Sequence, residues 1–201
     1  AYLAFTNTGI ITWSPMLYAW ILIPLTELFI TPDVKNMDAA EFELAKKDRI
    51  YDYLLYLFVF LQFAALLLFL MSLKTDTLQW WELAGRVWTM GLLCGTFGIN
   101  LGHELGHRVN RSEQFLAKAS LLTSLYMHFF IEHNKGHHKN VATPQDPASA
   151  KYNEPIYLFY FRTIIFSYLS AWKIANNEIE KKRLAILHWK NEMVQAHIIQ
   201  L

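Results

Sequence analysis

The hydrophobic positions of this chain gather into long apolar segments separated by shorter polar ones, a pattern typical of membrane-spanning helices. About 20 apolar residues are needed to cross the hydrocarbon core of a bilayer. Three segments reach this length, namely Ile10 to Ile30, Tyr51 to Leu73 and Trp81 to Leu101. The second carries one formal charge, Asp52, close to its beginning. The pattern therefore predicts an all-α integral membrane protein.

Three later apolar runs complete the pattern. Phe115 to Ile131 lies between two polar motifs, and we interpret it as re-entrant or partly embedded. Ile156 to Trp172 has Arg162 in its middle, which suits a helix along the interface with its basic group reaching toward water. A further apolar run begins at Met193. We expect four to five spans in this stretch, arranged as a multi-span helical bundle that forms a single membrane-embedded catalytic domain over residues 1–201.

Composition supports this class and narrows the chemistry. Apolar residues make up 54% of the chain, above the roughly 45 to 50% of ordinary soluble domains. The single cysteine, Cys94, excludes a disulfide framework and a cysteine-based metal motif within this sequence. A metal site must therefore use His and carboxylate side chains. The net charge of +1 gives no indication of a nucleic-acid partner, and we expect none.

The distribution of Lys and Arg predicts the orientation in the membrane, because cytoplasmic loops are enriched in these residues. The loop from Thr31 to Ile50 contains Lys35, Lys46, Lys47 and Arg49. The loop from Lys74 to Glu82 contains Lys74 alone. The first loop is therefore expected in the cytoplasm, and the third span then ends on that side. We predict an integral protein of the inner (cytoplasmic) membrane.

Two histidine motifs carry the candidate chemistry. They read His103-Glu104-Leu105-Gly106-His107 and His133-Asn134-Lys135-Gly136-His137-His138. On an α-helix, residues four apart share a face, so each motif can direct two imidazoles at one ion, while its next neighbour is rotated by about 100°. His138 therefore either serves a second ion or flanks a cleft. Imidazole suits zinc, copper, iron and nickel alike. We predict that all five histidines are metal ligands near the cytoplasmic face.

Other polar residues beside these motifs are candidates for supporting roles. Glu104 and Glu132 each adjoin a ligand histidine, and a carboxylate there can accept the second ring N–H of an imidazole. His128 lies about 140° from His133 on a regular helix, so we expect an orienting group rather than a ligand. Asp146, in a turn between two prolines, is either another such partner or a turn residue.

The first motif also fits a different class of enzyme. His103, Glu104 and His107 match the H-E-x-x-H pattern of zinc proteases, in which the Glu acts as a general base. A protease of this kind needs one further ligand, so the second cluster of histidines would be redundant for it. A third hypothesis is a metal-binding scaffold without catalysis.

Taken with their flanking residues, the two motifs resemble those of the integral-membrane, non-haem diiron alkane 1-monooxygenases. Asn100 precedes the first box as in that family, Glu132 opens the second, and the segment from Val141 to Ala148 follows it in the family's manner. The resemblance implies about six spans when complete. Desaturases and other histidine-box hydroxylases also bind metal through histidine boxes, but their sequences between the boxes are less similar to this one.

The resemblance carries further expectations. It implies two non-haem iron ions, O2 as co-substrate, and terminal hydroxylation of medium-chain n-alkanes to 1-alcohols. It implies electrons from rubredoxin, itself reduced by rubredoxin reductase. Asn100, next to the first motif, joins His128 and Asp146 as a candidate for orienting a ligand histidine. Members also carry a third box and an additional His, whereas here only His188 and His197 follow the second box. We therefore expect an N-terminal part of a longer enzyme. Hydroxylation of an aromatic methyl group, or hydroxylation or desaturation of a fatty acyl chain, remains the alternative.

Overall fold

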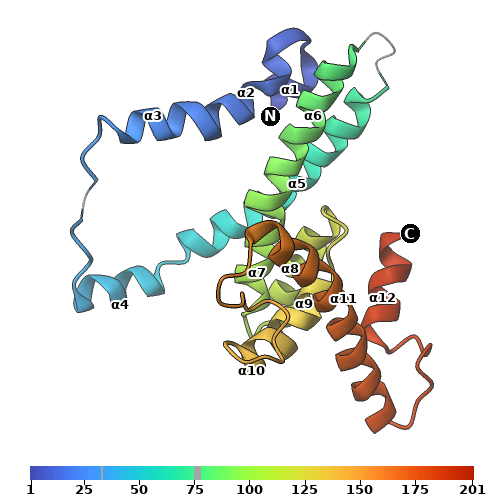
Figure 1. The fold of residues 1–201 in the computed structure, drawn as a ribbon. Helices are drawn as coiled ribbons and strands as arrows, with labels where there is room; N and C mark the ends of the chain where they lie inside the picture. The colour runs from blue at the N-terminus through green and yellow to red at the C-terminus, as the bar shows by residue number, and fades with distance from the viewer. Residues whose placement is uncertain (33, 75–77) are drawn as a thin grey trace. The chain divides into compact units, whose positions relative to one another are not determined.

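The computed structural model describes residues 1–32, 34–74 and 78–201, and these form helices and connecting turns without a β-strand. Residues 33 and 75–77, which belong to the two loops used to predict the orientation, lie outside the described part. The predicted all-α class is confirmed. The chain forms two compact units, residues 1–101 and residues 102–201 (Figure 1).

The first unit contains two helices that are long and apolar enough to cross a membrane, Gly9–Glu27 and Ile50–Ser72. Few residues in either are buried, 6% and 11% of the apolar window respectively, so their apolar side chains are not the core of a water-soluble fold. The first two predicted spans therefore correspond to real helices within a few residues. Low burial of apolar side chains is what is expected of helices that contact lipid, so both are candidate membrane spans.

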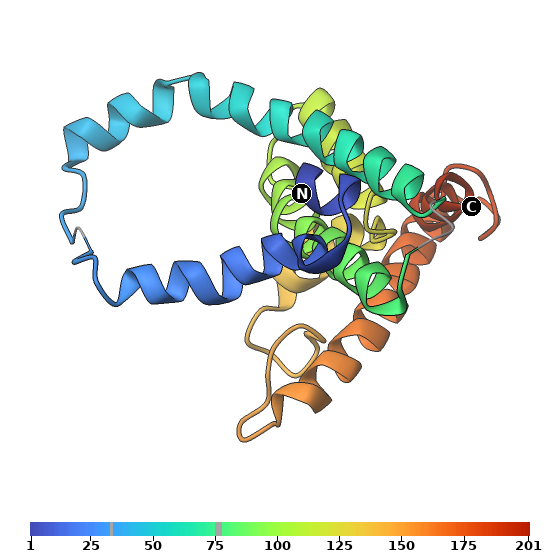
Figure 2. The ribbon, with the colours of Figure 1, turned by 90° about the horizontal axis from the view of Figure 1, so that it is seen from above.

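The helix over Gly9–Glu27 is nearly continuous but changes its winding along its length (Figure 2). Both prolines lie in the first turn of an α-helical stretch, where the missing N–H costs little. The segments in order are α1 (Tyr2–Thr6), the 3₁₀ turn η1 (Gly9–Trp13), α2 (Ser14–Leu17), the π turn η2 (Tyr18–Leu22) and α3 (Ile23–Glu27).

The remaining helices of this unit are α4, α5 and α6, of which α5 and α6 pack against each other. The elements run α4 (Ala39–Lys47), α5 (Ile50–Ser72), α6 (Trp80–Leu93) and the π turn η3 (Cys94–Ile99). α4 begins with a capping box in which Asp38 accepts from backbone N–H groups and Glu41 reaches back.

Two buried charges lie within the predicted third span, which the structure forms as α6 and η3. Glu82 accepts hydrogen bonds from the N–H groups of Gly9 and Gln79. Arg86 donates to the carbonyl oxygens of Ser72 and Asn7, at 2.6 and 2.8 Å. These charges lower the apolar character of the segment, which is not among the two helices that qualify as spans. The third span, and the total of four to five, stay predictions.

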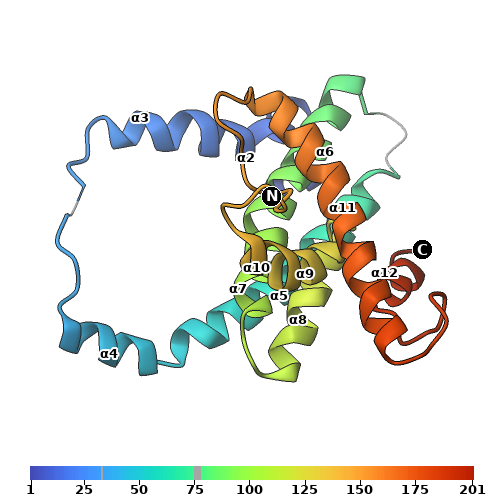
Figure 3. The ribbon, with the colours of Figure 1, turned by 60° about the horizontal axis from the view of Figure 1, so that its bottom comes forward.

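The second unit is organised around α11, the longest helix of the chain. Its core contains Ile131, Ala171, Ala175 and Met193, which come from three different helices. The two alanines lie one turn apart on α11, and their small side chains let α9 approach closely (Figure 3). The elements are α7 (Asn100–Gly106), α8 (Arg111–Leu122), α9 (His128–Glu132), the π turn η4 (His133–His137), α10 (His138–Asn140), α11 (Ile156–Lys181) and α12 (Glu192–Gln200).

The second unit differs from the sequence prediction in two details. The segment expected to be re-entrant, Phe115 to Ile131, is two helices, because α8 ends at Leu122 and α9 begins at His128. The interfacial segment is longer than its apolar part, since α11 continues to Lys181 through polar residues. Asn191, fully buried, caps α12 by accepting from the N–H of Met193. Whether the two units form one catalytic domain stays a prediction.

Candidate metal centre

α7 positions the first histidine pair. Leu101 and Leu105 are buried, which fixes the rotation of the helix. His103 lies on another face of α7, and His107 follows directly after the end of the helix at Gly106; their Nε2 atoms are 3.1 Å from each other. The helix therefore gives the first motif the geometry that its spacing predicts.

The second motif differs from the predicted α-helical geometry, because residues His133–His137 form a π turn. A π turn is wound more widely than an α-helix, with i→i+5 hydrogen bonds, so residues five apart come closer to one face than they do on an α-helix. His138 accordingly lies against His133, with 3.0 Å between their Nε2 atoms. The spacing suggested that His133 would pair with His137 as His103 pairs with His107. In the structure His133 pairs with His138 instead, and the rings of His133 and His137 stack with centroids 5.4 Å apart.

The histidine rings of the two motifs lie against one another. The Nε2 atom of His133 lies 3.2 Å from that of His107. The ligand atoms of His103, His107 and His133 are all within 4.8 Å of one another. His103, His107, His133 and His138 thus form a continuous series of Nε2 atoms, which we call the imidazole cluster. Four of the five predicted ligands meet in it.

The donor set of the imidazole cluster fits a metal ion. Metal–imidazole bonds are about 2.0 to 2.1 Å long, so neighbouring ligand nitrogens at right angles on one ion are about 3 Å apart. The distances of 3.0 to 3.2 Å match this spacing. Burial, and then the surrounding imidazoles, lower the pKa of His133 to about 3. Burial likewise lowers the pKa of His107. For these two residues the lowered pKa favours the neutral ring, the state in which imidazole binds metal.

His137, the fifth predicted ligand, is held by a carboxylate. Its Nδ1 atom lies 2.9 Å from Oδ2 of Asp146, whose residue is 3% exposed. The Asp146 carboxylate also accepts from Ser149 Oγ and from the N–H of Ala148. Although burial raises the pKa of Asp146, these hydrogen bonds lower it below its ordinary value overall. A carboxylate at Nδ1 leaves Nε2 of His137 available as a ligand atom. Of the two roles allowed for Asp146, the structure shows contact with a histidine.

The two glutamates do not contact an imidazole in the way that the sequence suggested. Glu104 accepts from Nη2 of Arg108 at 3.2 Å, one turn further along the chain. Glu132 is 3% exposed, and its Oε1 atom has no hydrogen-bond partner among the described residues. Burial raises the pKa of Glu132, which a hydrogen bond from Ser170 partly offsets. Its carboxylate lies close to Gly136, where an added Cβ would clash with it.

The remaining candidates lie away from the cluster. His128 packs edge-on against the rings of Tyr126 and Tyr168, with centroids 4.5 and 5.2 Å away. No contact among the described residues supports its predicted orienting role. Asn100 is exposed at the beginning of α7, one turn before His103.

Sequence reasoning missed the ion pairs that hold the second motif. Lys135 donates to Glu178 on α11 at 2.9 Å and to Glu192 on α12 at 3.0 Å. Lys118 lies 3.9 Å from the same Glu192. The π turn is therefore tied to both later helices. The partners are 43 and 57 residues away in the chain, so no local pattern identifies them.

This fold and site define an all-helical protein with two candidate membrane spans, in which two histidine motifs meet in an imidazole cluster suited to a metal ion. The family model described as fatty acid desaturase matches residues 78–199, which include both motifs. Because the match covers more than half of the chain, the protein belongs to this family.

Curated relatives are consistent with this membership. The chain is 34% identical over 178 residues to the alkane 1-monooxygenase of Pseudomonas putida, covering 89% of this chain and 44% of that protein. It is 34% identical over 194 residues to the alkane 1-monooxygenase of Ectopseudomonas oleovorans, covering 96% and 48%. Alkane 1-monooxygenase 1 of Alcanivorax borkumensis is 33% identical over 196 residues, covering 96% of this chain and 48% of that protein. The chain spans about half the length of these relatives.

Proposed function

We propose that this protein is an alkane 1-monooxygenase, which uses O2 to convert medium-chain n-alkanes to 1-alcohols at a histidine-ligated diiron site. The observation that carries the proposal is the meeting of both histidine motifs in one imidazole cluster. The identity to alkane 1-monooxygenases over 96% of the chain supports it.

The residues of the site have distinct parts in this proposal. The five histidines of the two motifs would hold iron, and bound iron would supply the activation of O2 and the insertion of one oxygen atom into a C–H bond. Asp146 keeps the proton of His137 on Nδ1, so that Nε2 faces the metal. Burial keeps His133 neutral and ready to bind. Release of the second oxygen atom as water would require two electrons and two protons, and the electrons must come from outside the chain.

We propose rubredoxin, reduced by rubredoxin reductase, as the source of these electrons. An acidic carrier could dock on four basic residues near the motifs, namely Arg108, Arg111, Lys135 and Lys139. Two of them are paired, Lys135 with Glu178 and Glu192, and Arg108 with Glu104. Arg111 and Lys139 are exposed to solvent. These two residues are therefore the main candidates for contact with an acidic carrier.

The location completes the proposal. We place the protein in the inner membrane with the imidazole cluster toward the cytoplasm, where a soluble electron carrier can reach it. The support is the Lys and Arg content of the loop from Thr31 to Ile50.

The test is product analysis with the full-length protein in membranes supplied with rubredoxin, its reductase and octane under ¹⁸O2. The proposal expects 1-octanol that carries one ¹⁸O atom. Hydroxylation of an aromatic methyl group, or hydroxylation or desaturation of an acyl chain, without octane turnover would favour another histidine-box oxidoreductase. Peptide cleavage without need of O2 would favour the zinc protease.

A further inference from the structure

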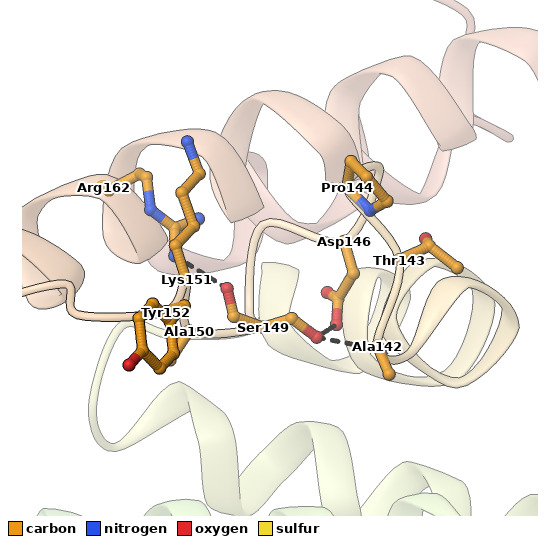
Figure 4. A pocket seen from close by; sticks show the side chains of 9 residues that line it. All are labelled: Ala142, Thr143, Pro144, Asp146, Ser149, Ala150, Lys151, Tyr152 and Arg162. Atoms are coloured by element: carbon orange, nitrogen blue, oxygen red, sulfur yellow. Dashed lines mark hydrogen bonds between the residues drawn. The ribbon is translucent and has the colours of Figure 1, made fainter.

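The loop of residues 141–155 carries Asp146 to the second histidine motif, and Arg162 of α11 holds this loop (Figure 4). Nη1 of Arg162 donates to the carbonyl oxygen of Pro147 at 2.9 Å. Its Nη2 donates to the carbonyl oxygen of Ser149 at 2.7 Å. The adjacent Thr163 adds a third bond, from its Oγ1 to the same Pro147 oxygen at 2.6 Å. One turn of α11 thus holds the loop through three hydrogen bonds to its backbone.

Glu154 fixes Arg162 in turn. Nε and Nη2 of Arg162 donate to the two carboxylate oxygens of Glu154, at 2.6 and 2.8 Å. The side chains are only 14% and 6% exposed, so the pair is shielded from water. The guanidinium lowers the pKa of Glu154 to about 2, with the N–H of Lys151 contributing. A bidentate pair of this kind has a fixed geometry that Lys cannot reproduce.

The residues that Arg162 and Thr163 hold, Pro147 and Ser149, lie beside or among those that hydrogen-bond Asp146. Pro147 and Ser149 flank Ala148, whose N–H donates to Asp146 Oδ1 at 2.9 Å. Ser149 Oγ donates to Asp146 Oδ2. An open cavity of about 570 Å³ borders this stretch, lined by Asp146, Ser149 and Arg162 among others (Figure 4). Because no described side chain fills this cavity, directed hydrogen bonds are what hold this side of the loop.

We propose that Arg162 and Glu154 are a positioning pair that sets the metal affinity of the second histidine motif by holding Asp146 against Nδ1 of His137. The inference rests on the proposed function only in requiring that the histidines bind metal. Neither residue contacts the imidazole cluster, and both act through the 2.9 Å contact between Asp146 and His137. Loss of such an outer partner typically weakens metal binding by about 10- to 100-fold.

The test is a double-mutant cycle on the detergent-solubilised full-length protein, with Co²⁺ as the probe and its visible absorption as the readout. We expect Asp146→Ala to weaken Co²⁺ binding by about 10- to 100-fold, and Arg162→Gln by about 10-fold. If Arg162 acts through Asp146, the double variant binds no more weakly than Asp146→Ala alone, within about two-fold. The matched control is Lys173→Gln, an exposed charge on the same helix, which should bind as wild type does.

A second readout reports the position of the loop directly. Trypsin should cleave after the exposed Lys151 faster in Arg162→Gln than in wild type or in the control. If Arg162→Gln fails to fold, Glu154→Gln replaces it, with an expected loss in the same direction.

The possible outcomes are distinguishable. Wild-type affinity in Arg162→Gln, or losses that multiply in the double variant, would overturn the positioning role while leaving the metal site intact. Wild-type protein that binds no Co²⁺ at the histidines would instead contradict the proposed function.

Discussion

At the scale of single residues, the site depends on which nitrogen of each imidazole is free. The members of the imidazole cluster face one another through Nε2, as the contact between His133 and His138 shows. His137 has its Nδ1 committed to Asp146. Its proton must therefore reside on Nδ1, because a carboxylate accepts and cannot donate. All five predicted ligands can consequently offer the same atom, Nε2, to a metal.

Replacement of Glu104 separates the oxygenase from the zinc protease. Its carboxylate pairs with the exposed Arg108, and such pairs contribute less than about 1 kcal/mol. Glu104→Gln should therefore retain the metal content and most of the octane turnover, both measured on the purified full-length protein. A loss of about 10²-fold or more in rate with metal retained is the effect of removing a general base, and it would favour the protease.

His128 predicts a pH dependence of stability. Burial, with a contribution from His197, lowers its pKa to about 4, whereas an ordinary histidine titrates near 6.5. Between these values the unfolded state binds more protons, so stability decreases as the pH falls from about 6.5 to about 4. The effect is at most roughly 3 kcal/mol.

The check is the Tm of wild type and His128→Phe at several pH values in that range. The variant also removes a buried Nε2 that has no hydrogen-bond partner among the described residues. Its Tm should fall less steeply on acidification than that of wild type. Parallel curves would show that folding does not lower the pKa of His128.

At the scale of elements, the π turn η4 determines the ligand arrangement. It brings His138 to His133, and it needs Gly136 because an added Cβ would meet the Glu132 carboxylate and lie 3.0 Å from Ile174 Cδ1. Gly136→Ala should displace the turn and lower the metal content. Gly106→Ala, in the first motif, places its Cβ at an ordinary 3.5 Å from its neighbours and is the matched control. Equal metal content in the two variants would mean that the π turn is not required.

The elements also show how far the sequence could predict this structure. The apolar pattern located the helices of Ile10 to Ile30 and Tyr51 to Leu73, because spanning helices need long apolar stretches. It could not reveal the π turn, since periodicity arguments assume 3.6 residues per turn. The ligand histidines were found by spacing, and four of the five meet as expected. The ion pairs of Lys135 depend on tertiary packing and were not predictable.

At the scale of the whole molecule, the orientation in the membrane can be measured. In a Cys94→Ser background, Ala40→Cys and Lys139→Cys should react with a membrane-impermeant maleimide only in inverted vesicles. Lys74→Cys should react only in vesicles of the opposite orientation, because its loop is expected outside the cytoplasm. Labelling of Lys139→Cys from the outer side would place the imidazole cluster away from the cytoplasm and would contradict the proposed delivery of electrons.

The central claim is that both histidine motifs build one diiron centre, and metal content tests it most directly. Inductively coupled plasma mass spectrometry on the purified full-length protein should find about two iron ions per chain. The variant with His137→Ala and His138→Ala, which leaves the first motif intact, should lose most of this iron. One zinc ion per chain, retained in that variant by His103 and His107, would contradict the account.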